Sequence, residues 1–385
     1  MIRLFFLFVP LLSVMTNASP SVGTSFADAI IQRYQPTIDV VTHHGWDHSN
    51  SVVLHGMEKV YKVTGKREYL QYIQGYADTF VKDDGSIEGL LSTLDGLHPG
   101  TITLFLYQQT GEKKYLQATR NMRDHLLKGS TFNKTPNGAY WHKNVDKYKN
   151  VATVDGLYMV YPFLVHYGVV AKDQVAIDAA AEQILLVSER SFSIKYGLPF
   201  HGWNYDKSKS WANPVTGTSS QFWSRASGWF SMALVDVLEY LPENHPSYQK
   251  ILFLYQSLAE GLSKQQDPDT GFWYHVLDAR NEKNNYPESS ATGMIVYSLS
   301  KGVELGLLDK RFAINADKGW QALQSKITTY SDGGPQLHSI APGMGVQDNF
   351  KAYLAIRPVS IPSTQKKQHM HGYMSVLMAA SQMEK

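Results

Sequence analysis

Two aspartates stand at equivalent places in the chain and could act together as an acid–base pair. Asp95 lies in "TLDGLHPG", just before a helix expected to begin at Pro99, and Asp155 lies in "ATVDGLYMVYPFL", at the start of another expected helix. A single aspartate at such a place is most often an N-cap. Both, however, stand at corresponding positions of helical hairpins, each followed by Gly and apolar residues. Equivalent inner-helix starts of a closed toroid meet at one mouth, so in such a fold we expect the two aspartates to converge. Converging carboxylates in an apolar, aromatic environment differ in pKa, leaving one protonated donor and one base.

An arginine stands beside tryptophans and small residues in "SSQFWSRASGWF", residues 219–230. On a helix, Arg225 and Trp229 are one turn apart and share a face, whereas Trp223 points elsewhere and suits a structural role equally well. A buried arginine needs an anionic partner. The stretch therefore predicts an anion contact next to an aromatic plate.

A metal site is the first alternative that the histidines suggest. Three of them cluster in "THHGWDHSN", namely His43, His44 and His48. The chain has no HExxH motif, and no carboxylate follows at a spacing typical of a zinc site. No G-x-S-x-G elbow, phosphate loop or dinucleotide fingerprint is present either. We therefore predict neither a metal nor a cofactor.

Aromatic residues make up 12% of the chain, with 23 Tyr and 8 Trp. Aromatic rings pack cores, but Tyr and Trp also line sugar sites, because they combine a flat apolar face with a polar group. One candidate is "LPFHGWNYDKSKSWANP", where His201 stands near Trp203 and Trp211. A histidine in such surroundings is more often structural, so this segment alone leaves both interpretations open.

The elements that must position these residues are helical hairpins. The segment "VTGKREYLQYIQGYADTFV" (63–81) matches "QTGEKKYLQATRNMRDHLL" (109–127), and the residues before each are also helix-like. A less similar form of the same pattern, a helix-breaking stretch followed by an amphipathic segment, occurs at 167–186, 241–262 and 305–323. The helices expected to pair with these segments are at 156–167, 227–240 and 291–305. Together with helices expected near 25–35 and 371–383, about twelve helices emerge.

Consecutive hairpins of this kind predict an all-α fold, an (α/α)6 barrel in which inner helices alternate with outer ones. An open solenoid would allow the same repeat. Three long irregular segments, 129–153, 193–220 and 329–370, favour the closed toroid, because loops of this length usually serve a function. We expect them to build a bowl-shaped site at one end of the barrel.

The chain begins with a segment typical of a secretory signal. Arg3 is followed by an apolar run from Leu4 to Val14 and by small residues ending at Ala18. The run is too short to span a membrane, so residues 1–18 are predicted as a signal peptide and 19–385 as a single barrel domain. The chain has no cysteine, and its net charge of +2 is too balanced for nucleic-acid binding. We expect an exported bacterial protein, periplasmic or secreted.

Several motifs, in order, resemble one enzyme family. "DGLHPG", "WHK…VDGLYMVYPFL", "HGW…WANPVTG", "FWSRASGWFSMALVDVL" and "GFWYHVLD…YPESSATGM" are similar to the unsaturated glycuronyl hydrolases, specifically the unsaturated rhamnogalacturonyl hydrolases of glycoside hydrolase family 105. The resemblance runs from about Trp46 to the end of the chain. It implies an (α/α)6 barrel, in agreement with the hairpins.

The resemblance also implies an unusual hydrolysis. Family members remove the unsaturated uronic acid that a polysaccharide lyase leaves at a non-reducing end. An aspartate protonates C4 of the C4=C5 double bond and activates water to attack C5. The resulting hemiketal opens and releases the aglycone. Carried over, Asp155 is this acid/base and Asp95 is the carboxylate that assists it. The acid must be neutral near the working pH, and burial beside a second carboxylate raises a pKa in that direction.

Around this pair the resemblance implies a set of substrate-binding residues. His201 and Arg225 would meet the carboxylate or hydroxyls of the uronate, and Trp229 would stack on its ring. The small residues beside Arg225 would keep the wall of the inner helix clear so that the sugar ring can approach. The whole implied set is His201, Arg225, Trp229, Met159, Lys143, His142, Trp46 and Trp211. The chain departs from the family at His48, where a tyrosine is common, and in the segment 329–370. Both border the expected subsite for the next sugar, which would be rhamnose from rhamnogalacturonan or sulfated rhamnose from ulvan.

Two other classes of protein remain open at this stage. A polysaccharide lyase or sugar epimerase can share the toroid, but it would use Tyr, His or Arg bases and would not need the Asp155 motif. A non-catalytic glycan-binding protein would need the tryptophans but not the paired carboxylates. The leading prediction is a metal-free exo-hydrolase whose partner is an oligosaccharide ending in an unsaturated uronic acid.

Overall fold

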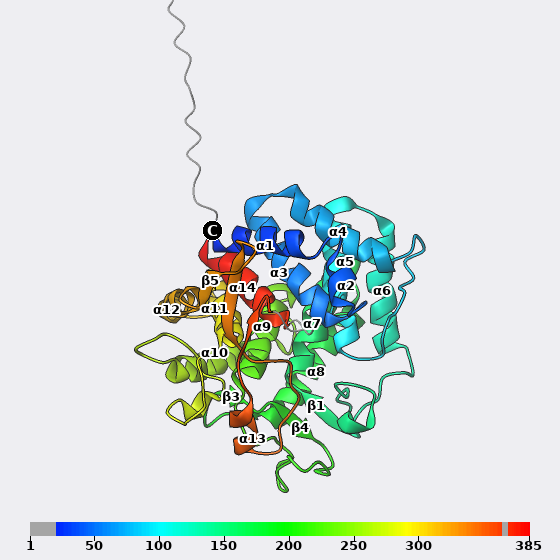
Figure 1. Cartoon of the computed structure of the whole chain (residues 1–385). Coiled ribbons are helices and arrows are strands. Elements are labelled where there is room, and N and C mark those ends of the chain that lie inside the picture. Colours follow the sequence, from blue (N-terminus) through cyan, green and yellow to red (C-terminus); the bar gives the residue numbers. More distant parts are fainter. Residues whose placement is uncertain (1–20, 364–368) are drawn as a thin grey trace, which may run out of the picture.

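The computed structural model describes residues 21–363 and 369–385 (Figure 1). The predicted signal peptide, residues 1–18, lies outside the described residues. Within the described part of the chain, no helix is both long and apolar enough to cross a membrane.

Six helices form a closed inner ring. Each inner helix contacts the next inner helix along the chain, and the last inner helix contacts the first. In order around the ring, they are α3 (His48–Thr64), α5 (Gly100–Thr110), α7 (Asp155–Ala171), α9 (Ser224–Tyr240), α11 (Ser289–Glu304) and α14 (His371–Met383). The contact between α14 and α3 closes the ring, so the predicted toroid is confirmed and the open solenoid is wrong.

A second set of helices surrounds this ring, and each packs most extensively on one inner helix. Taken in the order of their inner partners α3, α5, α7, α9, α11 and α14, they are α4 (Arg67–Phe80), α6 (Lys113–Leu127), α8 (Gln174–Ser191), α10 (Tyr248–Gln265), α12 (Phe312–Gln324) and α1 (Val22–Arg33). The first helix of the barrel therefore covers the last, which brings the two ends of the described chain together (Figure 1).

Short elements fill the loops between the hairpins. The additional helical turns are α2 (Ile38–Thr42), η1 (Asp95–Leu97), η2 (Asp146–Tyr148), η3 (Leu277–Ala279) and α13 (Phe350–Ala355). The strands are β1 (Val151–Thr153), β2 (Phe192–Ser193), β3 (Leu198–Pro199), β4 (Gly202–Asn204), β5 (Ile327–Thr329), β6 (Pro335–Ile340) and β7 (Val359–Ile361). They form three small antiparallel sheets, β1–β4, β2–β3 and β5–β6–β7, which stiffen the long segments that the sequence marked as functional.

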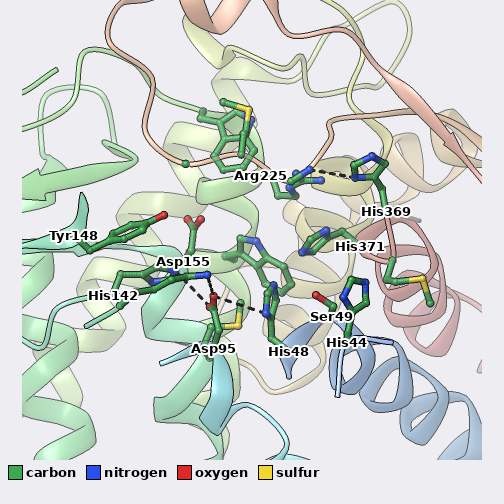
Figure 2. Close-up of a pocket in the computed structure, with 18 residues that line it drawn as sticks. His44, His48, Ser49, Asp95, His142, Tyr148, Asp155, Arg225, His369 and His371 are labelled. Atoms are coloured by element: carbon green, nitrogen blue, oxygen red, sulfur yellow. Dashed lines mark hydrogen bonds and ion pairs between the residues drawn. The ribbon is translucent and has the colours of Figure 1, made fainter. Parts of the chain in front are cut away.

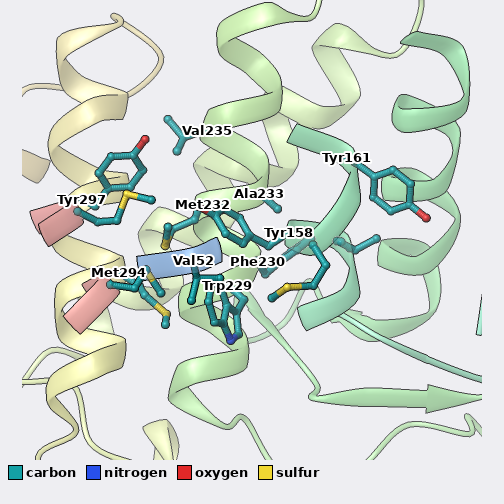
Figure 3. Close-up of a cluster of buried hydrophobic side chains, with 14 of the residues drawn as sticks. Val52, Tyr158, Tyr161, Trp229, Phe230, Met232, Ala233, Val235, Met294 and Tyr297 are labelled. Carbon is teal, nitrogen blue, oxygen red and sulfur yellow. The ribbon is translucent and has the colours of Figure 1, made fainter. Parts of the chain in front are cut away.

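The inner helices are buried on nearly every side, as α9 shows. Its residues from 224 to 238 are all buried, and side chains of neighbouring inner helices meet it in the core drawn in Figure 3. A Cβ at Gly228 would lie only 2.9 Å from Sδ of Met294 on α11. Gly228 thus allows two inner helices to approach each other. The expectation that this small residue clears a wall for a sugar is wrong, since helix packing already requires it.

All six inner helices start at the same end of the barrel. His48, Asp155 and His371 are the first residues of α3, α7 and α14, and Arg225 is the second residue of α9. Asp95 stands just before α5, in η1. Side chains of all five line one cavity, so the helix starts converge as the hairpin repeat predicted.

We predict that Glu384 stabilises the closure of the barrel. Its Oε1 accepts a hydrogen bond from the backbone N–H of Val22 (2.8 Å) and its Oε2 from that of Gly23 (2.9 Å), at the start of α1. A carboxylate is favourable there, because it satisfies free N–H groups and complements the helix dipole. Glu384→Ala should lower the free energy of unfolding in urea by about 1–2 kcal/mol, and Glu384→Gln by less. An unchanged unfolding midpoint in Glu384→Ala would contradict this role.

Candidate active site

A cavity of about 280 Å³ opens at the end of the barrel where the inner helices begin (Figure 2). Its volume is close to the lower limit of small-molecule sites, which run from roughly 300 to 1,000 Å³. The lining consists of His44, His48, Ser49, Asp95, His142, Lys143, Tyr148, Asp155, Met159, Trp223, Arg225, Trp229, Gly343, Met344, Gly345, His369, Met370 and His371. The cavity thus offers two carboxylates, several nitrogen donors and aromatic faces.

Asp95 is surrounded by nitrogen-bearing side chains on one side of the cavity. Nζ of Lys143 lies 2.6 Å from its Oδ2, and Nε2 of His142 lies 3.4 Å from its Oδ1. Nδ1 of His48 lies 3.8 Å from Oδ2 and only 2.8 Å from Oδ1 of Asp47. The Asp95 carboxylate is therefore held by groups from α3 and from the loop that precedes β1.

These neighbours determine the charge of Asp95. Burial raises the pKa of its carboxyl, but His48, His142 and Lys143 outweigh burial and hold the pKa well below its usual range. Burial likewise lowers the pKa of His48, whereas Asp95 and Asp47 raise it, and the net shift is upward. Cations are the nearest partners of Asp95, so its carboxyl is ionised and is not the protonated donor that the sequence led us to expect in the pair.

Asp155 has a different environment across the cavity. It is the first residue of α7, and its side chain is partly exposed to the cavity. Its Oδ2 lies 3.4 Å from Nε2 of His201, while its Oδ1 finds no hydrogen-bond partner among the described residues. Unlike Asp95, Asp155 has no lysine or arginine beside it among the ion pairs of the described part of the chain.

Arg225 is buried against the aromatic ring that precedes its helix. Its guanidinium carbon lies 5.0 Å from the centre of the Trp223 ring. Its Nη1 donates to the carbonyl of Ala341 and to Oγ of Ser290, and its Nη2 donates to the carbonyl of Pro342. Arg225 therefore joins the inner ring to the long segment that follows β6.

The charge of Arg225 is compensated inside the protein. Burial lowers the pKa of its guanidinium, and the fully buried Glu288 partly offsets that effect. Glu288 thus already supplies part of the negative charge that a buried arginine requires, and a bound anion would supply more.

Trp229 and Met159 both line the cavity, as predicted. The Trp229 ring packs at 5.0 Å from Tyr158 and at 5.7 Å, edge to face, from His371. Figure 3 shows Trp229 at the margin of the buried core, so one side of the ring is fixed by packing. A ring fixed in this way is suited to stacking on a sugar.

Three of the predicted binding residues lie outside the cavity lining. Trp46 is buried, and its ring stacks on Tyr76 with an angle of 4° between the planes, so it belongs to the core. Trp211 stands in the loop after β4 and does not reach the lining. His201 is buried behind Asp155 and contacts it from the protein side, so its predicted direct contact with substrate does not match its position.

Other lining residues were missed or misjudged from the sequence. Helical periodicity left the role of Trp223 open, because on a helix it would not share a face with Arg225, and the structure places it in the lining. It stands before α9 in extended backbone (φ −74°, ψ 125°), where helical periodicity does not apply. His48 and residues 343–345, 369 and 370 do line the cavity, in agreement with the expectation that His48 and the segment 329–370 border a sugar subsite. The residues that the sequence did not single out for substrate binding are His44, Ser49, Tyr148 and His371. His371 is the first residue of an inner helix, so the hairpin repeat could have identified it.

The histidines of the cavity do not gather as metal ligands. In residues 21–363 and 369–385, no group of three or more His, Cys, Asp or Glu side chains has the arrangement that could hold a metal ion. His48 is engaged instead with Asp47 and Asp95.

Comparisons with known proteins agree with this architecture. The family model described as Glycosyl Hydrolase Family 88 matches residues 23–385. A solved glycoside hydrolase of family 105 from C. acetobutylicum ATCC 824 is 30% identical, covers 95% of this chain and 99% of its own, and superposes with a TM-score of 0.85.

Two curated relatives have named activities. The "unsaturated 3S-rhamnoglycuronyl hydrolase" of Alteromonas sp. (strain LOR) is 31% identical over 60% of this chain and 50% of its own length. The "unsaturated rhamnogalacturonyl hydrolase YesR" of Bacillus subtilis (strain 168) is 25% identical over 73% of this chain and 76% of its own length.

Proposed function

The chain belongs to Glycosyl Hydrolase Family 88, among the unsaturated glycuronyl hydrolases of family 105, and from this membership we propose its reaction. The enzyme removes the 4-deoxy-hex-4-enuronosyl residue from the non-reducing end of oligosaccharides that a lyase has produced. The observation that carries the proposal is the pair of carboxylates, Asp95 and Asp155, in different environments of one small cavity. The cavity volume of about 280 Å³ favours one terminal sugar over an internal stretch of chain.

In the proposed reaction, Asp155 donates a proton to C4 of the C4=C5 double bond. The positive charge that develops on C5 and the ring oxygen is then quenched by water, whose proton returns to Asp155. The hemiketal at C5 opens, and the aglycone leaves from C1. An acid–base group that contacts both the proton acceptor and the water accounts for typically 10²–10⁴-fold of such a rate.

Asp95 is proposed to assist as a fixed negative charge. Held ionised by Lys143, His142 and His48, it stabilises the positive charge that develops on the sugar ring. Trp229 would stack on the ring, and Met159 would pack beside it. Arg225 and the starts of the inner helices favour the uronate carboxylate, since both attract anions.

The aglycone is proposed to be rhamnose, as part of rhamnogalacturonan or ulvan fragments. The names of the two curated relatives support this choice, since one is a rhamnogalacturonyl hydrolase and the other a 3S-rhamnoglycuronyl hydrolase. We further propose that the protein is exported to the periplasm or the medium. Sequencing the N-terminus of the mature protein from those fractions tests the export; a chain that starts at Met1 in the cytoplasm would contradict it.

One assay tests the proposed reaction and separates it from the alternatives. Lyase digests of rhamnogalacturonan and of ulvan are incubated with the enzyme, and the ultraviolet absorbance of the conjugated double bond is followed. Loss of absorbance with release of a rhamnose-ended product supports hydration. Gain of absorbance would indicate a lyase. No change on either digest would overturn the proposed substrate.

A further inference from the structure

The segment from Ala341 to Ala355 borders the active site, and its residues Gly343, Met344 and Gly345 line the cavity. At its beginning, the carbonyls of Ala341 and Pro342 accept hydrogen bonds from Arg225. At its end, in α13, the hydroxyl of Tyr353 lies 3.1 Å from Nδ1 of His201. Tyr353 is fully buried and His201 is 1% exposed, so water does not replace this hydrogen bond.

The contacts on the two sides of the His201 ring indicate which way the Tyr353 hydrogen points. Among the hydrogen bonds of the described residues, the partner of the Tyr353 hydroxyl is Nδ1 of His201. Burial raises the pKa of the Tyr353 phenol, so it keeps its proton. On the other side of the ring, Nε2 of His201 faces a carboxylate oxygen of Asp155, which accepts hydrogen bonds and, when ionised, cannot donate one. The phenol therefore donates to Nδ1 of His201.

We infer that Tyr353 is a positioning residue that selects one tautomer of His201 for the sake of Asp155. Because Nδ1 of His201 accepts from Tyr353, the ring proton of the neutral imidazole resides on Nε2. Nε2 is the atom that faces Oδ2 of Asp155 at 3.4 Å. The order Tyr353–His201–Asp155 therefore presents an N–H donor to the acid–base carboxyl.

The chemistry of Asp155 requires this direction. In the other tautomer, a lone pair on Nε2 would face the carboxyl. It would repel the ionised Asp155 and would accept the proton of the neutral form, which the substrate should receive instead. The tautomer with its proton on Nε2 orients the Asp155 carboxyl whether Asp155 is ionised or protonated. In neither state does it accept the proton of Asp155. This role rests on the proposed function, in which Asp155 protonates C4.

The test is Tyr353→Phe, which removes only the hydroxyl. We expect kcat for loss of the double bond to fall about tenfold, the scale of losing one orienting hydrogen bond. KM should change less than twofold, because Tyr353 does not touch the substrate. Long-range ¹H–¹⁵N spectra should show a single Nε2–H tautomer of His201 in the parent and a mixture in the variant. The His201→Gln variant assigns the signals.

Two further variants separate positioning from stability. Tyr72→Phe is the control: it likewise removes the hydroxyl of a buried tyrosine, but one on an outer helix. The Tyr72 hydroxyl donates to the carbonyl of Tyr34 at 2.6 Å. This variant should keep full kcat. In a His201→Gln background, Tyr353→Phe should cost little further kcat, because the tautomer it selects is gone.

Each result decides the role of Tyr353. Wild-type kcat in Tyr353→Phe, or a loss of kcat while the Nε2–H tautomer persists alone, would overturn it. The spectra need no substrate. Failure of the proposed function, seen as no change of absorbance with any digest, is therefore distinguishable from failure of this inference.

Discussion

Replacement of Asp155 by asparagine should abolish nearly all turnover while leaving substrate binding intact. The amide has the shape of the carboxyl but cannot donate an acid proton to C4 or receive one from water. A positioned acid–base group contributes typically 10²–10⁴-fold, so we expect kcat to fall by about 10³-fold. Isothermal titration of Asp155→Asn with an unsaturated oligosaccharide should give a Kd within a few fold of the parent KM. Absorbance of the double bond measures the loss of turnover.

A matched control lies at the same mouth of the barrel. Asp146, in η2, is exposed and carries the same functional group outside the cavity lining. Asp146→Asn should retain full kcat and KM. If Asp155→Asn keeps more than a tenth of the parent kcat, another group protonates the double bond and the assignment of Asp155 is wrong.

The fold was predictable because hairpins repeat. The shared Thr-Gly break and Tyr-Leu-Gln opening mark α4 and α6, and the partner helices of the less similar segments correspond to α7, α9 and α11. What the repeat could not supply is the closure between α14 and α3, which are far apart in sequence. That contact depends on tertiary packing, as does the cap that Glu384 provides to α1.

The site residues at the starts of the inner helices could be predicted from the repeat. The contacts that the loops make in the site could not. Asp95 and Asp155 line one cavity because equivalent helix starts meet at one end. The charge state of Asp95 depends on Lys143, His142 and His48, which come from separate parts of the chain that meet only in the fold. For the same reason, the sequence could not show that Tyr353 reaches His201 from α13.

The opposite end of the barrel should be where a single substitution costs the most stability. Lys301, near the end of α11, is 5% exposed and donates to Oδ1 of Asp236 (2.8 Å) and to Oε2 of Glu239 (2.6 Å), both near the end of α9. Burial lowers the pKa of Lys301, but the two carboxylates outweigh it and raise the pKa. Lys301→Met fills a similar volume and leaves the buried Asp236 without its cation. Breaking a buried pair costs about 3–5 kcal/mol, which urea unfolding measures.

Controls isolate the buried charge as the cause of that loss. Lys385→Met removes an exposed lysine that pairs with Glu304, on the same helix as Lys301, and should cost less than about 1 kcal/mol. Adding Asp236→Asn to Lys301→Met should recover part of the stability, because the neutral amide still accepts from Tyr297. At temperatures where each variant is folded, kcat should stay at the parent value, since the catalytic cavity lies at the other end of the inner helices. A loss of less than 1 kcal/mol in Lys301→Met would mean that Asp236 finds another cation or water, and that this ion pair does not stabilise the barrel.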